Sequence, residues 1–188
     1  TTHAAYDSFA RLTKVWAEGD TSESPTLLVT YHDHAYYSFD SQSPAYLPFQ
    51  VDLAQKVDGS ASIKLSRFYN GLGERIQTQR VQLLPDENGD LEQKSIVANT
   101  VYDPLGRAVT QGNPFAIGYD SSPEYSSAAG GNGGTETRYD VYSRPTSVTQ
   151  ANGSVVSYEY NGLQTTVTDP GGAQTVTLKD AWGRVSTV

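Results

Sequence analysis

Polar and apolar residues alternate along much of the chain, in short runs separated by turn sequences. In the run from 154 to 160, the side chains of Val156, Tyr158 and Tyr160 fall on one face of an extended strand, because side chains in a strand alternate with a period of two. A similar run rich in β-branched residues occupies 165–168. Asn-Gly and Asp-Pro-Gly-Gly sequences stand between such runs and favour tight turns. The pattern predicts an antiparallel meander with strands of about six residues.

One stretch near the start of the chain also has helical spacing. Residues 4–18 contain no glycine or proline, and apolar side chains recur there every three or four positions. The centre of this stretch, Tyr6 to Leu12, matches turn sequences found elsewhere in the chain, so we favour strand–turn–strand. No other stretch has a helical pattern. The predicted fold class is all-β, an antiparallel β-hairpin repeat of the meander type.

A short signature recurs through the chain: an aromatic residue, Asp or Asn, two variable positions, glycine and arginine. Its clearest copy is 102–107. In that order Asp can accept a hydrogen bond from the backbone two residues on, and glycine can adopt the left-handed conformation that follows the turn. Ala10 and Ser143 replace the glycine, so we expect strained or different turns there. The residues assigned a structural role in turns are Tyr6, Asp7, Arg11, Tyr69, Asn70, Gly73, Tyr102, Asp103, Gly106, Arg107, Tyr139, Asp140, Arg144, Asp180, Gly183 and Arg184.

The spacing of the copies indicates how the chain is organised. The intervals from 139 to 160 and from 160 to 179 are 21 and 19 residues, and two longer intervals of 33 and 37 residues contain loop insertions at 85–90 and 126–134. The first interval, from 6 to 69, spans 63 residues without a clean copy. We therefore predict β-hairpin repeats over residues 66–188. Residues 1–65 form a β-rich part in which any repeat is degenerate.

Composition excludes several classes of protein. Among 188 residues there is no cysteine, which excludes disulfide scaffolds, cysteine-zinc sites and thiol catalysis. The net charge of −8 makes the chain a poor partner for nucleic acid. No apolar run reaches the ~18 residues of a membrane span, so we expect no membrane insertion in this segment. The sequence shows no secretion signal. The chain begins with Thr1 instead of Met, from which we expect a piece of a longer protein.

These residues resemble the YD-repeat, or RHS-repeat, family, whose hallmark is Tyr-Asp-x-x-Gly-Arg. The resemblance covers 66–188 well and 1–65 weakly. It implies a fragment of a large secreted or cell-surface protein whose repeats form a long β-sheet that spirals into a hollow shell. In toxin-encapsulating members the shell encloses a C-terminal effector, and other members serve adhesion. The implied role is that of a non-enzymatic structural segment without a cofactor, extracellular or at the cell surface. The implied partners are neighbouring repeats, self-association and an enclosed toxin polypeptide.

Two other functions stay open from the residues. Exposed aromatic side chains, with Trp182 foremost, could stack on sugar rings, which would make the chain an adhesin-like module for carbohydrate or another surface. Family members that cleave themselves use paired aspartates in Asp-Pro-x-Gly motifs, and Asp103 and Asp169 each stand in such a motif. Repetition of Asp at every turn favours turn geometry over acid–base chemistry.

Three further motifs have a structural reading beside a chemical one. His32 and His34 share a strand face and are the candidate metal ligands, although a third ligand would have to come from elsewhere. The acidic stretch 86–92 lacks the spacing of an EF-hand and is typical of a hairpin tip. Asn152-Gly153-Ser154 fits the N-glycosylation pattern, and its hairpin role explains it equally well.

Overall fold

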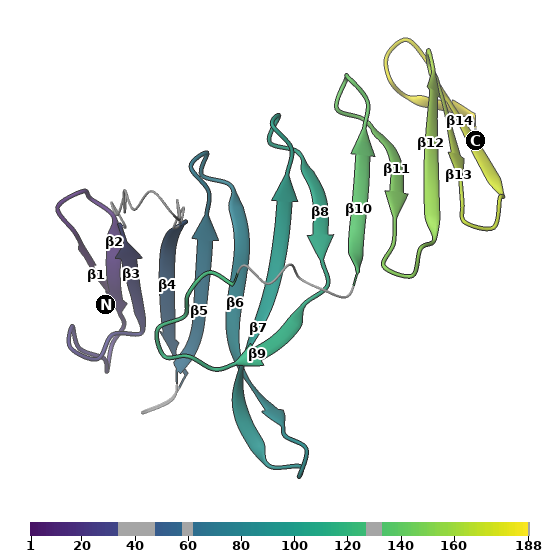
Figure 1. Cartoon of the computed structure of the whole chain (residues 1–188). Helices are drawn as coiled ribbons and strands as arrows, with labels where there is room; N and C mark the ends of the chain where they lie inside the picture. Colours follow the sequence, from purple (N-terminus) through teal and green to yellow (C-terminus); the bar gives the residue numbers. More distant parts are fainter. Residues whose placement is uncertain (34–47, 58–61, 127–132, 188) are drawn as a thin grey trace, which may run out of the picture. The chain divides into compact units, whose positions relative to one another are not determined.

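The chain folds into β-strands joined by tight turns (Figure 1). The structure is a computed structural model that describes residues 1–33, 48–57, 62–126 and 133–187. Over these ranges there are fifteen strands, and every pair is antiparallel. The prediction of an all-β hairpin meander is therefore confirmed, including strand–turn–strand near the start. None of the described residues belongs to a helix that could cross a membrane.

The chain divides into two compact units. Unit 1 comprises Thr1–Asn99 with Pro114–Ala129, and unit 2 comprises Thr100–Asn113 with Gly130–Val188. The strands of unit 1 are β1 (His3–Tyr6), β2 (Leu12–Trp16), β3 (Leu27–His32), β4 (Phe49–Lys56), β5 (Ser62–Tyr69), β6 (Arg75–Pro85), most of β7 (Leu91–Tyr102) and β9 (Phe115–Gly118). Those of unit 2 are the end of β7, β8 (Ala108–Gly112), β10 (Gly134–Tyr139), β11 (Pro145–Thr149), β12 (Val155–Asn161), β13 (Gln164–Thr168), β14 (Gln174–Lys179) and β15 (Val185–Thr187).

One turn geometry recurs at both ends of the strands. In eight turns the first N–H donates to the fifth carbonyl, and the fourth N–H donates to the first carbonyl. The fourth residue has a positive φ in all eight, and the strand register shifts beside the turn where the repeat signature occurs, as at Tyr102. This is a type I turn closed by a bulge. The fourth residue is glycine in six of these turns, because glycine alone adopts positive φ without strain.

Ala10 and Ser143 occupy the same position in the two remaining turns. Their φ angles are 60° and 63°, and each turn keeps both backbone hydrogen bonds. A side chain in this region costs on the order of 1 kcal/mol relative to glycine. The turns at these two sites are thus strained but not different in form.

Few side chains are buried, since the sheet has a single layer over most of its length. The buried hydrophobic residues of the described chain are Val29, Phe68 and Val97, and all three lie in unit 1. In unit 2 no described residue is fully buried, although Val156, Tyr158 and Tyr160 are half-buried on one face. Cross-strand pairs and turn contacts, more than a core, must therefore hold unit 2 together.

A returning segment covers one face of unit 1. After β9 pairs with the edge of β7, residues 119–126, which we call the strap, cross in front of the middle strands (Figure 1). Beneath the strap lie Gln50, Phe68 and Gln77, which are paired in register on β4, β5 and β6 and share one face. The insertion predicted at 126–134 is longer in the structure and includes β9. Residues 115–118 alternate like a strand of the repeat, but they pair with the edge of β7 instead of extending the meander.

Candidate functional site: clasps between the repeat hairpins

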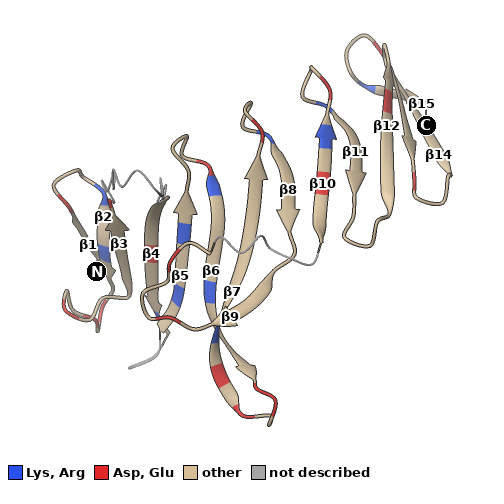
Figure 2. Ribbon diagram, viewed as in Figure 1, with Lys and Arg blue, Asp and Glu red and all other residues tan. Residues whose placement is uncertain are grey.

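The aspartate that opens each repeat turn is held by three hydrogen bonds. Asp103 Oδ1 accepts the backbone N–H groups of Leu105 and Arg107 at 2.9 and 3.0 Å, and Oδ2 accepts the Nε–H of Arg107 at 2.7 Å. The same three bonds recur in the turns that begin at Asp7, Asp140 and Asp180. Each carboxylate thus fixes both the turn and the arginine side chain. Figure 2 shows the resulting pairs of acidic and basic residues at the turns.

The arginine in turn holds the tyrosine of the following hairpin. The guanidinium carbon of Arg107 lies 4.9 Å from the centre of the Tyr139 ring, and the Tyr139 hydroxyl donates to the Ala108 carbonyl at 3.0 Å. Arg144 lies 4.1 Å above Tyr160, whose hydroxyl donates to the Pro145 carbonyl at 2.8 Å. We call this arrangement of aspartate, arginine and next tyrosine a clasp. It joins one hairpin to the next.

A third clasp lies in unit 1, where the sequence shows no clean repeat. Arg11 lies 4.2 Å above the Tyr31 ring, and the Tyr31 hydroxyl donates to the Leu12 carbonyl at 3.1 Å. Asp33 accepts two hydrogen bonds of 2.7 Å from the Arg11 guanidinium. Sequence reasoning missed Tyr31 because a histidine separates it from the acid. The usable signal was an aromatic residue with an aspartate two positions later.

Other copies of the signature keep only part of the clasp. Asn70 replaces the aspartate and still caps its turn, with Oδ1 accepting from Leu72 and Glu74 backbone N–H groups and Nδ2 donating to the Glu74 carboxylate at 2.6 Å. Arg184 binds Asp180, but its side chain is largely exposed. The role of the remaining signature residues as turn elements stays a prediction.

These contacts keep the clasp aspartates charged. The hydrogen bond from the Arg107 guanidinium holds the pKa of Asp103 below its ordinary value of 3.8, and backbone N–H groups add to the effect. For Asp140, partial burial pushes the pKa upward, but hydrogen bonds from Arg144 and the turn backbone outweigh it and the pKa is lowered. The carboxylates of Asp7 and Asp180 behave like that of Asp140.

The structure does not bring the candidate self-cleavage pair together. Asp103 follows β7 and Asp169 follows β13, and the antiparallel order of the strands places these two turns at opposite ends of the sheet of unit 2. Asp103 is bound to Arg107, and Asp169 Oδ1 accepts the Ala173 N–H at 2.8 Å. Each carboxylate therefore accepts backbone hydrogen bonds within its own turn.

The metal and glycan candidates have local partners. His32 Nε2 lies 2.8 Å from Asp52 Oδ2, while His34 lies outside the described residues. Within the described ranges no group of three or more His, Cys, Asp or Glu side chains could hold a metal ion. In the stretch 86–92, Asp86 Oδ1 caps the hairpin turn by accepting two backbone N–H groups. Asn152 accepts the Ser154 N–H in the same kind of turn.

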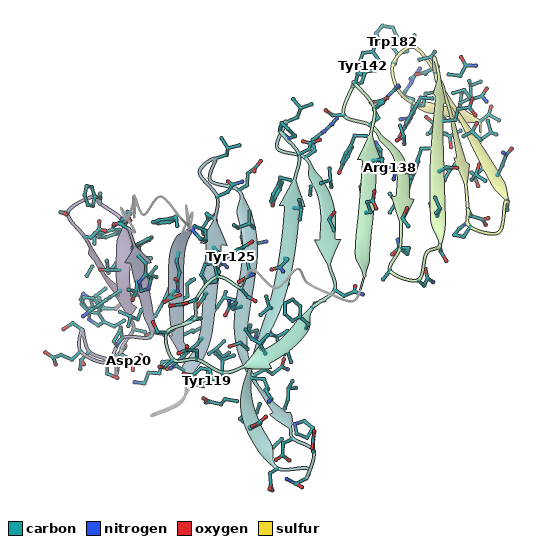
Figure 3. The ribbon with its side chains drawn as sticks, viewed as in Figure 1. Asp20, Tyr119, Tyr125, Arg138, Tyr142 and Trp182 are labelled. Carbon is teal, nitrogen blue, oxygen red and sulfur yellow. The ribbon has the colours of Figure 1, made fainter. Side chains whose placement is uncertain are left out.

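Aromatic side chains fall into two groups. The clasp tyrosines are half-buried under arginine. The third residue of a repeat turn, by contrast, points into solvent: Tyr142 is 77% exposed and Trp182 is 83% exposed, and Figure 3 shows both at turn tips. Phe9, Leu72 and Leu105 are exposed at the equivalent position. The sequence expectation of an exposed Trp182 is confirmed.

Comparison with known proteins agrees with this β-hairpin repeat architecture. Residues 139–174 match the RHS Repeat family. This stretch contains β11 and β12, the β10–β11 turn and the clasp of Asp140, Arg144 and Tyr160. No curated protein matches the chain. The resemblance drawn from the signature is confirmed, and residues 139–174 carry an RHS repeat.

Solved structures share the fold. A structure titled TcdB2-TccC3-Cdc42 matches 98% of this chain with a TM-score of 0.74 and 12% identity. TcdB2-TccC3 without hypervariable C-terminal region matches 79% with a TM-score of 0.61 and 18% identity, and TcdB2-TccC3-TEV matches 82% with a TM-score of 0.60 and 17% identity. The chain spans only 14%, 8% and 9% of those chains, respectively.

The clasps should lose strength in acid. A carboxylate whose pKa is lowered from 3.8 in the folded chain stabilises the fold above that pH, and the contribution disappears as the pH falls through the lowered pKa. We expect the unfolding temperature, followed by far-UV circular dichroism at fixed ionic strength, to fall steadily below about pH 4.

A pair of variants separates the clasps from other carboxylates. The double variant Asp103→Asn, Asp140→Asn should unfold at a lower temperature than wild type at neutral pH. Its unfolding temperature should also fall less than that of wild type as the pH is lowered. Glu136→Gln is the control, because Glu136 pairs with Arg138 at 3.2 Å outside the clasps, and it should keep the wild-type acid slope. The same acid slope in the double variant as in wild type would contradict the account.

Proposed function

We propose that this chain is a non-enzymatic wall segment of a large secreted or cell-surface protein, in which the sheet encloses a toxin polypeptide. The observation that carries the proposal is the repeated clasp. Its aspartate and arginine lie in one hairpin and its tyrosine in the next, as with Arg144 and Tyr160. A hairpin built in this way can be added to a sheet without a core of its own, because each new unit is held by its neighbour.

The burial pattern supports a wall over a compact enzyme. A catalytic site usually occupies a concave pocket with several polar groups that converge on it. Here the acids of the signature are spread over successive turns, and each is neutralised by its own arginine, as in the pairs Asp103–Arg107 and Asp140–Arg144. A single-layer sheet with charged turns at its ends instead suits a surface that divides two compartments.

Limited proteolysis of the full-length parent protein tests the enclosure. In wild type, a polypeptide inside the wall should resist protease while the free polypeptide does not. Replacing Arg107 and Arg144 with alanine opens two clasps, and we expect the enclosed polypeptide to be cleaved about tenfold faster, a change equivalent to about 1.4 kcal/mol in the opening equilibrium.

The control for proteolysis is Arg138→Ala, which removes an exposed arginine of β10 outside the clasps (Figure 3). It should leave the cleavage rate unchanged. The enclosure proposal fails if wild type protects no polypeptide, or if the control speeds cleavage as much as the clasp variant does.

A second candidate function rests on the exposed turn tips. The side chains of Tyr142 and Trp182 are exposed in unit 2, although the Arg144 guanidinium lies 5.2 Å from the centre of the Tyr142 ring, and exposed aromatic faces can stack on sugar rings. An adhesin-like role predicts reproducible binding of the purified chain to a glycan array, with at least about tenfold loss in the Trp182→Ala variant. Leu105→Ala, at the equivalent tip of another turn, should have no effect. An array without signal would contradict this second function and leave the wall proposal untouched.

A further inference from the structure

The strap is held to the sheet by glutamine side chains. Gln50 Nε2 donates to the Pro123 carbonyl at 3.0 Å, and Gln79 Nε2 donates to the Glu124 carbonyl at 2.7 Å. Gln77 binds at two atoms: its Nε2 donates to the Ser126 carbonyl at 2.9 Å, and its Oε1 accepts the N–H of the same residue at 3.0 Å. Three carbonyls within four consecutive residues are thus bound by three side-chain amides.

The glutamines contact the main chain of the strap and not its side chains. The side chain of Glu124 is exposed although its carbonyl is bound, and Ser126 is bound only through backbone atoms. Two tyrosines provide the side-chain anchors, because Tyr125 packs edge-on against Phe68 and Tyr119 accepts a hydrogen bond from Lys64 at 2.9 Å (Figure 3). Recognition through backbone groups places little demand on sequence.

Neighbouring side chains on the sheet also hold these amides. Gln79 Nε2 also donates to Gln77 Oε1 at 2.8 Å, and Gln77 Nε2 donates to Asn99 Oδ1 at 2.7 Å. Gln50 Nε2 donates to Asp52 Oδ1 at 2.9 Å. The orientation of each amide is therefore set by neighbours on the sheet, as in a preorganised binding site.

The three glutamines are buried where the strap crosses them. Gln50, Gln77 and Gln79 are 7%, 1% and 3% exposed under the strap. A buried amide that loses its partner is destabilising, so this face favours a bound main chain over an apolar cover. Packing under the strap is nevertheless incomplete, since a cavity of about 160 Å³ lies between it and the sheet, lined by Leu28 and Tyr119 among others.

We propose that Gln50, Gln77 and Gln79 form a cradle that binds extended polypeptide through its main-chain carbonyls, with the strap as resident occupant. A second extended polypeptide of unrelated sequence can take the place of the strap. The proposal goes beyond the wall function and stands on the strap contacts alone. Because the strap is tethered, it competes at an effective concentration in the millimolar range, so exchange becomes measurable once its anchors are removed.

A peptide-binding experiment on the full chain tests the cradle. The probe is a fluorescent ten-residue peptide with the sequence of residues 117–126, and the receptor carries Tyr119→Ala and Tyr125→Ala to loosen the strap. We expect the peptide to bind this receptor at least tenfold more tightly than it binds the wild-type chain, measured by fluorescence anisotropy. A second peptide that keeps both tyrosines in place and scrambles the remaining residues should bind within about threefold of the native sequence, since backbone groups carry the rest of the recognition.

Substitutions of the cradle glutamines test whether the peptide binds at the cradle. Adding Gln77→Leu and Gln79→Leu to the loosened receptor should abolish binding, with far-UV circular dichroism used to check that the sheet is retained. If that receptor does not fold, Gln50→Leu alone should weaken binding by about fivefold, as expected for the loss of one hydrogen bond of about 1 kcal/mol.

Three results would overturn the cradle: no binding by either peptide, binding by the native sequence alone, or binding that survives the leucine substitutions. None of them bears on the wall proposal, because that proposal depends on the arginine clasps and is read out by protease protection.

Discussion

The contact on which the rest of this structure depends is the arginine held between a turn aspartate and the tyrosine of the next hairpin. A sheet of one layer cannot rely on a core, and unit 2 has no fully buried residue in its described part. In such a sheet, backbone hydrogen bonds join the strands, and the clasps Asp103–Arg107–Tyr139 and Asp140–Arg144–Tyr160 lock successive hairpins. The arginine is suited to this because a planar guanidinium can bind a carboxylate and stack on a ring at once.

The two units are stabilised in different ways. The described part of unit 1 has one clasp, at Arg11, and one of its faces is in addition covered by the strap, whose Tyr125 packs against the buried Phe68. The strap covers this face as a second sheet would, and the glutamines beneath hold it by donating hydrogen bonds to its carbonyls. Unit 2 lacks a cover over its described strands and depends on clasps and β-branched cross-strand pairs such as Val148 with Val156.

Features encoded by residues close together in the sequence could be predicted from it. The turn at Asp103 is encoded within six residues, so its strands, its glycine and its place in the meander follow from the signature. Contacts between distant segments carry no such local code. Tyr31 completes a clasp across an interval without a recognisable repeat, and the strap returns to glutamines 45 to 73 positions earlier. The strain at Ser143 follows from the missing glycine, as expected, because the hydrogen bonds of its turn impose a φ of 63° that its side chain disfavours.

The most direct test of the central claim is a double-mutant cycle on Arg144 and Tyr160, with free energies of unfolding measured in urea for Arg144→Gln, Tyr160→Leu and the double variant. The guanidinium lies 4.1 Å from the ring centre, so the two side chains should be coupled by about 0.5 to 1 kcal/mol. Free energies that add to within about 0.3 kcal/mol would show that the two hairpins are not clasped through this contact, and would contradict the account.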